Sequence, residues 1–194
     1  CLEELGRLCV KEETFPSFLD WDELRTVMET DMPAGRLERV KDVFVFCALT
    51  GLSYQGISTL CPSHLFRDDE GTLWICRTRA EGAEVGDSCT SRVPLLKPAM
   101  VLLEKYRGWN PMNPEGPCFP VPSVQKMNEY LKEVSVLCRI SKRLTTQMAR
   151  NTFAATVTLA NRIPKEHVGE MLGYSSDYML RHYTQALERN SQKA

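Results

Sequence analysis

The sequence predicts a mainly α-helical domain with a small antiparallel β-sheet, which places it in the α+β class. Apolar residues recur at helical spacing over most of the 194-residue chain. Between His64 and Leu95 this spacing gives way to β-branched and aromatic residues separated by turn signals. The content of 43% hydrophobic and 25% charged residues is typical of a soluble globular protein, and the chain is long enough to bury a real core.

Two helices and a short helical turn are expected before the sheet. Asp20 and Glu23 have capping-box spacing at the start of the first helix, which stops near Pro33. The second helix carries a strong apolar stripe and ends at Gly51, a residue type favoured at helix C-termini. A short turn of helix follows at residues 54–60. The stripe of the second helix consists of Leu37, Val40, Phe44, Cys47 and Ala48.

The sheet is expected to have three strands. Residues 68–71 signal a turn, and residues 72–79 after it are rich in strand formers. Residues 81–87 form a glycine-containing loop, and residues 91–95 fit a returning strand. Pro94 has no N–H to donate, so this strand should lie at an edge.

Helical patterns return after the sheet. We expect helices at residues 100–107 and 124–138, separated by a loop rich in proline, glycine and asparagine at residues 109–122. A further helix should begin at Thr145 or Thr146, since either can serve as its N-cap. The apolar stripe of that helix consists of Ala149, Phe153, Val157 and Ala160.

Two short helices should end the chain. Pro164 fits the first turn of one and Gly173 its C-terminal stop, while Ser176 can cap the other. The last helix would carry Tyr183 in its second turn, on a stripe with apolar neighbours. Tyr183 therefore fits either an ordinary half-buried aromatic or a nucleophile, because a phenol oxygen can attack a phosphodiester.

Gln147 and Arg150 lie three residues apart and share a helix face that is distinct from the apolar stripe. An arginine can bind a phosphate through two parallel hydrogen bonds and keeps its charge, although a lone helical arginine is often only a surface ion-pairing residue. The glutamine can hydrogen-bond a phosphate but cannot exchange a proton at neutral pH.

The order of these residues resembles the catalytic domain of the tyrosine recombinase (phage integrase) family. The family pattern is His-x-x-Arg, then Leu-Gly-His, then the nucleophilic tyrosine. Here Gln147-x-x-Arg150, Leu-Gly-Tyr174 and Tyr183 occupy those places with matching spacing, and both histidines are replaced. The resemblance covers roughly residues 15–190 and implies the tyrosine recombinase catalytic-domain fold.

Further segments carry the same resemblance. The stretch Thr-Gly-Leu-Ser53-Tyr is similar to the family's Thr-Gly-Leu-Arg, so Ser53 stands where the family has its first phosphate-binding arginine. Together with Met-Ala-Arg-x-Thr-Phe-Ala, it looks most like integrases of Bacteroides-type conjugative transposons. Members of that branch can use an Arg-x-Lys pair on the β-hairpin instead. Arg79 matches that arginine, with Arg77 as an equal alternative, and Glu81 falls where the lysine would be.

The resemblance implies a mobile-element recombinase or integrase that cleaves and rejoins DNA through a 3′-phosphotyrosine, without a metal or other cofactor. Tyr183 would attack, Arg150 and Arg79 would hold the phosphate, and Gln147 and Tyr174 would add hydrogen bonds. Each lost transition-state donor costs roughly a hundredfold to a thousandfold in rate, so the substituted positions point to weakened activity. The alternative is a catalytically degenerate DNA-binding relative, and a more distant one is a helical interaction domain unrelated to DNA.

The expected partner is double-stranded DNA at attachment or element-end sites, bound by a homo-tetramer, with the isolated chain monomeric. The net charge of −1 gives no argument for DNA binding by the whole chain. Residues 139–194, however, hold nine Lys or Arg against four Asp or Glu. That excess fits either a phosphate-facing surface or an ordinary solvated face.

The ends of the chain and its cysteines complete the expectations. The chain begins at Cys1 rather than at methionine, so we expect residues 1–14 to be a linker remnant from a missing DNA-binding region and residues 15–194 to be the catalytic domain. No leader or membrane-spanning run is present in the sequence, and none of the eight cysteines forms a Cys-x-x-Cys pair. We expect a cytoplasmic location and reduced thiols, with Cys47 and Cys138 buried.

Overall fold

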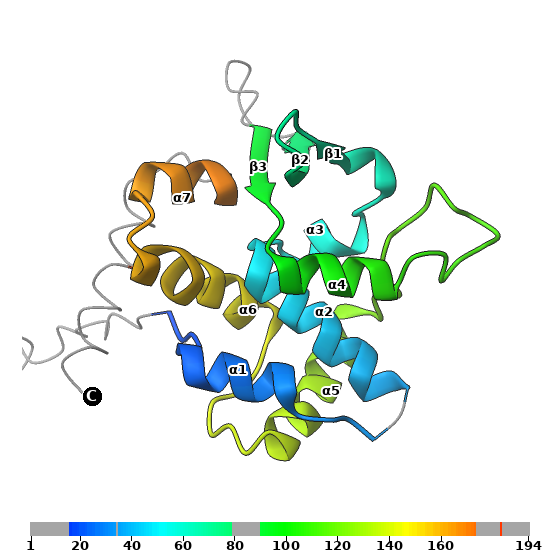
Figure 1. Ribbon diagram of the computed structural model, residues 1–194. Coiled ribbons are helices and arrows are strands. Elements are labelled where there is room, and N and C mark those ends of the chain that lie inside the picture. The colour runs from blue at the N-terminus through cyan, green and yellow to red at the C-terminus, as the bar shows by residue number, and fades with distance from the viewer. Residues whose placement is uncertain (1–15, 34, 79–89, 174–182, 184–194) are drawn as a thin grey trace, which may run out of the picture.

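The computed structural model describes residues 16–33, 35–78, 90–173 and 183, and this part of the chain is mainly helical with one small antiparallel sheet, as predicted (Figure 1). Most of the predicted helices and strands are present. In chain order the elements are α1 (Trp21–Glu29), α2 (Arg36–Thr50), α3 (Tyr54–Ser58), η1 (Pro62–His64), β1 (Leu65–Arg67), β2 (Leu73–Thr78), β3 (Thr90–Pro94), α4 (Lys97–Lys105), α5 (Val124–Leu137), α6 (Thr146–Thr152), η2 (Phe153–Thr158), η3 (Leu159–Asn161) and α7 (Lys165–Leu172).

Helix α2 is the centre of the fold, and α1, α4, α5 and α6 pack against it (Figure 1). Twelve of its 15 residues are buried, so it is enclosed on every side. One of the buried residues is acidic. The carboxylate of Asp42 accepts hydrogen bonds from Tyr106 Oη at 2.9 Å and Lys105 Nζ at 2.7 Å, which offset the cost of burying its charge.

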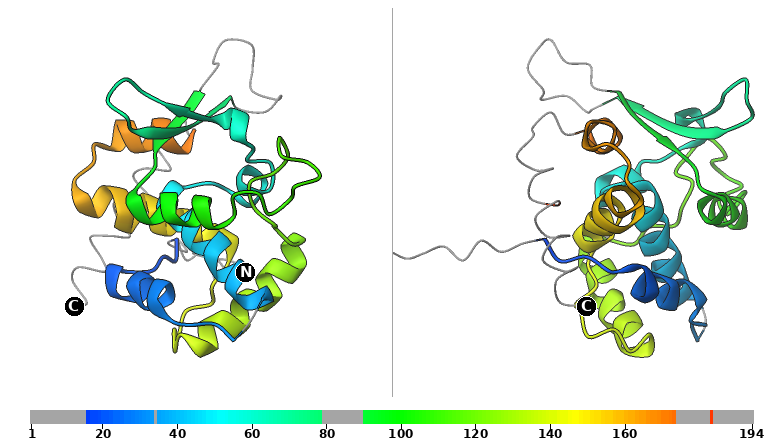
Figure 2. Two further views of the ribbon diagram at one scale, coloured as in Figure 1. Left: turned by 45° about the vertical axis from the view of Figure 1, so that its right-hand side comes forward. Right: turned by 60° about the vertical axis from the view of Figure 1, so that its left-hand side comes forward.

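The sheet lies at one end of the molecule, with β2 between β1 and β3 (Figure 2). All pairs are antiparallel, and Ile75 lies opposite Val93. Both side chains are buried and therefore face the helices, whereas Phe66 and Trp74 stack on the other face with ring centroids 6.3 Å apart. Pro94 lies on edge strand β3, as predicted, and β3 packs against α7.

The helix that begins at Thr146 does not continue as the regular α-helix that the sequence predicted. After α6 the chain widens into the π-helical turn η2 and then the 3₁₀ turn η3. Thr158 Oγ1 donates to the carbonyl oxygens of Phe153 and Ala154, and such back-bonding disturbs a regular helix. The expected apolar stripe therefore breaks at Ala160, which is exposed. Pro164 lies one residue before α7, as its N-cap, because its backbone is extended there.

Residues 16–19 are tied to α6 and η2 by side chains rather than by a sheet or helix. Leu19 N–H donates to Thr152 Oγ1 at 3.1 Å, and Thr156 Oγ1 donates to the Leu19 carbonyl. Asn151 Nδ2 donates to the Ser17 carbonyl at 3.0 Å. Lys142 Nζ adds a bond to the Phe18 carbonyl at 3.1 Å, so polar side chains before, on and after α6 help to position the short segment that precedes α1.

Cys47 and Cys138 are buried, as predicted. Burial raises the pKa of the Cys47 thiol to about 12, so at pH 8 its thiolate is roughly a thousandfold scarcer than that of an ordinary cysteine. We expect iodoacetamide at pH 8 to modify the half-exposed Cys61 and Cys76 while Cys47 stays unmodified in the folded protein. Peptide mass spectrometry measures this, and modification of Cys47 as fast as Cys61 would contradict the buried position.

Candidate functional site

Helix α6 places three polar side chains at one end of the helical core. Thr145 is its N-cap, one of the two predicted positions, and its Oγ1 accepts from Met148 N–H at 3.1 Å. From this start Gln147 is exposed, Arg150 is half-buried and Asn151 is buried. The helix therefore orders these groups from the solvent inward.

Tyr183 and Gln147, which are 36 residues apart in the sequence, meet at one oxygen atom. Asn151 Oδ1 accepts a hydrogen bond from Tyr183 Oη at 2.9 Å and another from Gln147 Nε2 at 3.0 Å. Asn151 was not among the residues singled out in the sequence. Its position four residues after Gln147 puts it on the same helix face, and that spacing is the signal that could have found it.

The ring of Tyr183 is buried, with 1% of its surface exposed. It belongs to a small apolar cluster whose other buried members come from β3, η2 and α7. These are Val93, Phe153, Ala154, Val168 and Leu172. In this position the phenol lies beside the polar residues of α6 but cannot touch a phosphate in solvent, so any reaction with DNA requires the side chain to move out.

Arg150 joins the C-terminal ends of two helices. Its guanidinium donates to the carbonyl of Gly51, which ends α2, and to the carbonyl of Leu172 at 2.5 Å, which ends α7. Helix C-termini carry partial negative charge, which stabilises a cation placed there. The arginine therefore holds three elements together and presents a fixed positive charge next to the residues that meet at Asn151.

Gly51 makes this junction possible. Its backbone has φ +70°, and an added Cβ would lie 2.5 Å from Phe153 Cδ1 and 2.9 Å from Leu172 Cδ2. We expect Gly51→Ala to lower the free energy of unfolding by roughly 3 kcal/mol, because left-handed backbone and overpacking add. Gly173→Ala is the matched control: this C-cap has φ +66° with no atom within 4 Å of the added Cβ, so about 1 kcal/mol is expected. Urea unfolding measures both, and equal losses would exclude the steric argument.

The remaining predicted site residues lie apart or outside the described residues. Ser53 is exposed and caps α3, accepting from Gly56 N–H at 3.1 Å, so its hydroxyl has a structural role in this short helix. Arg79, Glu81 and Tyr174 are outside the described residues. Arg77, the alternative to Arg79, donates to the Gly56 carbonyl and to Thr59 Oγ1 at 2.8 Å. Arg77 is thus bound to the short helix that Ser53 caps.

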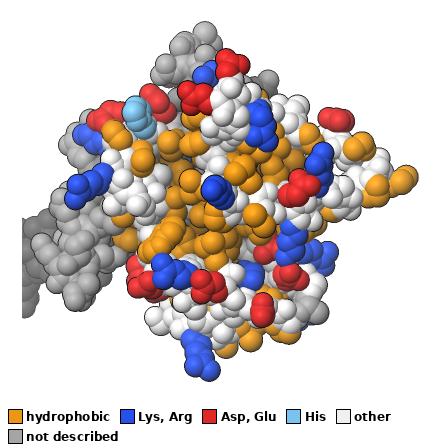
Figure 3. Space-filling view, viewed as in Figure 1, with side chains coloured by type: hydrophobic (Ala, Val, Ile, Leu, Met, Phe, Trp, Pro, Cys, Tyr) orange, Lys and Arg blue, Asp and Glu red, His pale blue; other side chains and the backbone are white. Residues whose placement is uncertain are grey.

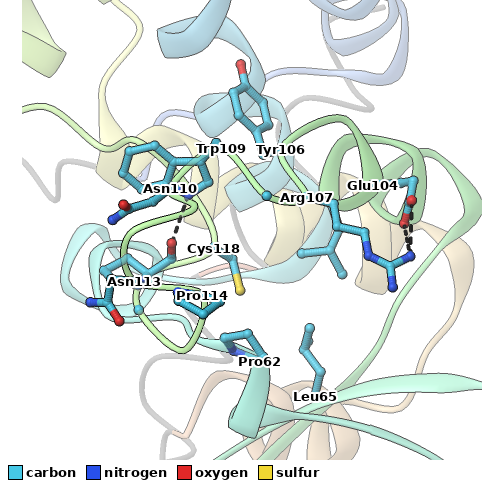
Figure 4. Close-up of a pocket in the computed structure, with 14 residues that line it drawn as sticks. Pro62, Leu65, Glu104, Tyr106, Arg107, Trp109, Asn110, Asn113, Pro114 and Cys118 are labelled. Atoms are coloured by element: carbon cyan, nitrogen blue, oxygen red, sulfur yellow. Dashed lines mark hydrogen bonds and ion pairs between the residues drawn. The ribbon is translucent and has the colours of Figure 1, made fainter.

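A separate cavity of about 490 Å³ lies between α4 and the loop that follows it (Figure 4). Its polar groups bond to one another. Arg107 pairs with Glu104 at 3.3 Å, and Trp109 Nε1 donates to the Pro117 carbonyl at 2.9 Å. None of the predicted site residues that the structure describes lines this cavity, so it gives no support to the proposed chemistry.

The face seen in Figure 3 carries apolar side chains at its centre with basic and acidic side chains mixed around them. Val101 of α4 and Leu96, which caps the start of that helix, are among the exposed apolar residues. This described surface is not a basic stripe of the kind that follows DNA phosphates. Within the described ranges, no helix is long and apolar enough to cross a bilayer, and no group of three or more His, Cys, Asp or Glu could hold a metal ion.

No family model and no curated protein matches this sequence. Solved structures do resemble it. XerH site-specific recombinase bound to its difH substrate gives a TM-score of 0.70 at 15% identity over 92% of this chain. The Tn1549 transposon integrase bound to transposon right-end DNA gives 0.69 at 14% identity over 95%. The catalytic domain of bacteriophage HP1 integrase gives 0.59 at 18% identity over 87%.

The chain has the tyrosine recombinase catalytic-domain fold. It spans 52% of the XerH chain, 68% of the Tn1549 integrase chain and 87% of the HP1 integrase catalytic domain. At identities of 14–18% the likeness establishes the fold, and the roles of individual residues rest on the site geometry described above.

Proposed function

We propose that this chain is the catalytic domain of a site-specific DNA recombinase or integrase that cleaves and rejoins DNA through a 3′-phosphotyrosine. The observation that carries the proposal is the meeting of Tyr183 and Gln147 at Asn151, one residue along α6 from Arg150. A phenol and an amide donor thus share one acceptor, and the arginine proposed to bind the phosphate is the preceding residue of the same helix. XerH and the Tn1549 integrase, which share the fold, are both bound to DNA in their structures.

In the proposed reaction the Tyr183 phenol gives its proton to solvent water as its oxygen forms a bond to the phosphorus. The bond from phosphorus to the 5′-oxygen breaks, and the released 5′-oxygen takes up a proton from water. Arg150, with Arg79, stabilises the charge that develops on the nonbridging oxygens. Gln147 and Tyr174 donate hydrogen bonds to the same phosphate. Attack by a 5′-hydroxyl of another strand reverses these steps and releases the phenol. The scheme needs no metal or other cofactor.

Activity is proposed to be weakened. Gln147 cannot supply a proton to the leaving oxygen, and Ser53 is occupied as a helix cap instead of binding a phosphate. Glu81 would repel the developing negative charge unless its pKa were raised. Members of the Bacteroides-type conjugative-transposon integrases can use an Arg-x-Lys pair on the β-hairpin in place of the missing arginine. In this chain Glu81 falls where the lysine of that pair would be.

One alternative has an observation in its favour. A DNA-binding relative that no longer cleaves would have no use for an exposed nucleophile, and the Tyr183 phenol is buried. Either protein would be expected to act on double-stranded attachment or element-end DNA in the cytoplasm, as a homo-tetramer that the isolated domain forms only on DNA. In both cases binding should weaken steeply as salt rises, because phosphate contacts release counterions.

Covalent trapping tests the proposal. The protein is incubated with a library of nicked duplexes of random sequence, whose cleaved strand loses the short fragment needed for rejoining. Protein–DNA species that survive denaturing electrophoresis are collected, and their peptides and DNA are sequenced. We expect an adduct on the Tyr183 peptide with an enriched DNA sequence. Salt-sensitive binding without any adduct would instead establish the non-cleaving alternative.

A further inference from the structure

Asn151 has a hydrogen-bonding pattern that the proposed chemistry does not require. Its side chain is buried, with 6% exposure, and both ends of the amide are used. The oxygen accepts from Tyr183 and Gln147, and the nitrogen donates to the Ser17 carbonyl at 3.0 Å. One amide thus connects the candidate nucleophile, a candidate phosphate ligand and the segment before α1.

The hydrogen bond to Asn151 Oδ1 holds the Tyr183 hydroxyl as a donor. An amide oxygen is a hydrogen-bond acceptor but not a base, so the phenol proton is held without being removed. The ring is enclosed by the apolar cluster of β3, η2 and α7, where a phenolate would be poorly solvated. The hydrogen bond and the enclosure therefore favour the same arrangement, in which the phenol is neutral and unable to reach DNA.

A bound phosphate could release Tyr183 from Asn151. Both groups on Asn151 Oδ1 are donors, and a phosphate oxygen is a charged acceptor that forms stronger hydrogen bonds than an amide does. A phosphate held by Arg150 would thus compete with Asn151 for Gln147 and Tyr183 together. The same donors that DNA needs are the ones that Asn151 occupies.

We propose that Asn151 is a positioning residue that holds Tyr183 in a buried resting position until a DNA phosphate replaces the amide oxygen as its partner. The catalytic consequence rests on the proposed function. The resting position itself is a property of the protein without DNA, and it can be measured there.

Nitration of tyrosines by tetranitromethane at pH 8, followed by peptide mass spectrometry, measures that position. In the wild-type protein Tyr183 should react far more slowly than the half-buried Tyr54 and Tyr130. Asn151→Leu keeps the branched shape and the number of heavy atoms of the side chain and removes the acceptor, so nitration of Tyr183 should become roughly threefold to tenfold faster. Tyr106 is the internal control, because it is buried but bonded to Asp42, and its rate should stay unchanged.

Two more variants separate the contact with Tyr183 from general loosening. Asn151→Asp keeps an oxygen for Tyr183 and Gln147 but loses the donor to Ser17, so Tyr183 should react no faster than in wild type. Thr152→Val removes a different bond between the same segment and the same helix, the one from Leu19 N–H, and should also leave the nitration rate of Tyr183 unchanged. Faster Tyr183 nitration in all three variants, a parallel rise at Tyr106, or no change in Asn151→Leu would each overturn the proposal.

Trapping on the DNA selected by the wild-type protein then tests the consequence for the reaction. Asn151→Leu should form the covalent adduct severalfold faster than wild type at saturating DNA, because more molecules have a released phenol. A slower adduct in a variant with faster nitration would show that Asn151 also serves in cleavage, and would overturn the resting role. If neither protein forms an adduct, the proposed function fails, and the nitration rates alone decide whether Asn151 holds Tyr183.

Discussion

Replacing Tyr183 by phenylalanine is expected to abolish the covalent protein–DNA adduct. The phenylalanine ring has no hydroxyl, so the variant lacks the oxygen that attacks the phosphorus in the proposed reaction. DNA binding should persist, because phosphate contacts come from cationic and amide groups. The same loss removes a hydrogen bond to Asn151 Oδ1, which keeps its second donor from Gln147. The free energy of unfolding should therefore fall by only about 1 kcal/mol.

Tyr106→Phe is the matched control for this experiment. It also removes a buried hydroxyl, but this one lies at the end of α4 and donates to Asp42 of α2 at 2.9 Å rather than to Asn151. Its loss of stability should be at least as large, since the partner is a carboxylate, and its adduct should form normally. An adduct that persists in Tyr183→Phe would assign the nucleophile to a different residue, and an adduct lost in both variants would point to unfolding.

The fold could be predicted from the sequence because its signals are local. Apolar spacing places α2 and α5, cap residues place the starts of α1 and α6, and a turn signal places the hairpin before β2. The exception is η2, where regular spacing predicted a continuous helix. Its departure depends on threonine hydroxyls that bond back to the chain, and apolar spacing does not report such bonds.

The candidate site could be predicted only in part. Family spacing identified Gln147, Arg150 and Tyr183, and the structure places the first and last on the same amide. Family spacing did not identify Asn151, because the role of a hydrogen-bond acceptor depends on which donors the tertiary fold brings to it. Nor could it decide whether Tyr183 is exposed. The apolar stripe that includes Tyr183 suggested an ordinary half-buried aromatic as the alternative to a nucleophile, and the structure buries the ring more completely than that.

Arg150→Lys is expected to slow adduct formation by roughly a hundredfold to a thousandfold, the usual cost of removing one preorganised donor from a transition state. Lysine keeps the positive charge but has one nitrogen, so it cannot span the Gly51 and Leu172 carbonyls and also offer a planar pair of donors to a phosphate. The loss should appear in the rate at saturating DNA rather than in DNA affinity. A charge-only role would predict little change.

Arg36→Lys is the matched control, because it makes the same substitution at the opposite end of α2 from Gly51. Arg36 pairs with Glu133 at 3.6 Å and lies over the Tyr130 ring. It should leave the adduct rate unchanged. Urea unfolding of both variants separates an effect on the reaction from an effect on folding. Arg150→Lys loses contacts at two helix ends, so its adduct rate is interpreted only if the variant is folded at the assay temperature. A folded Arg150→Lys protein with the wild-type rate would show that the guanidinium only joins α2 to α7, and the phosphate-binding role would pass to another cation.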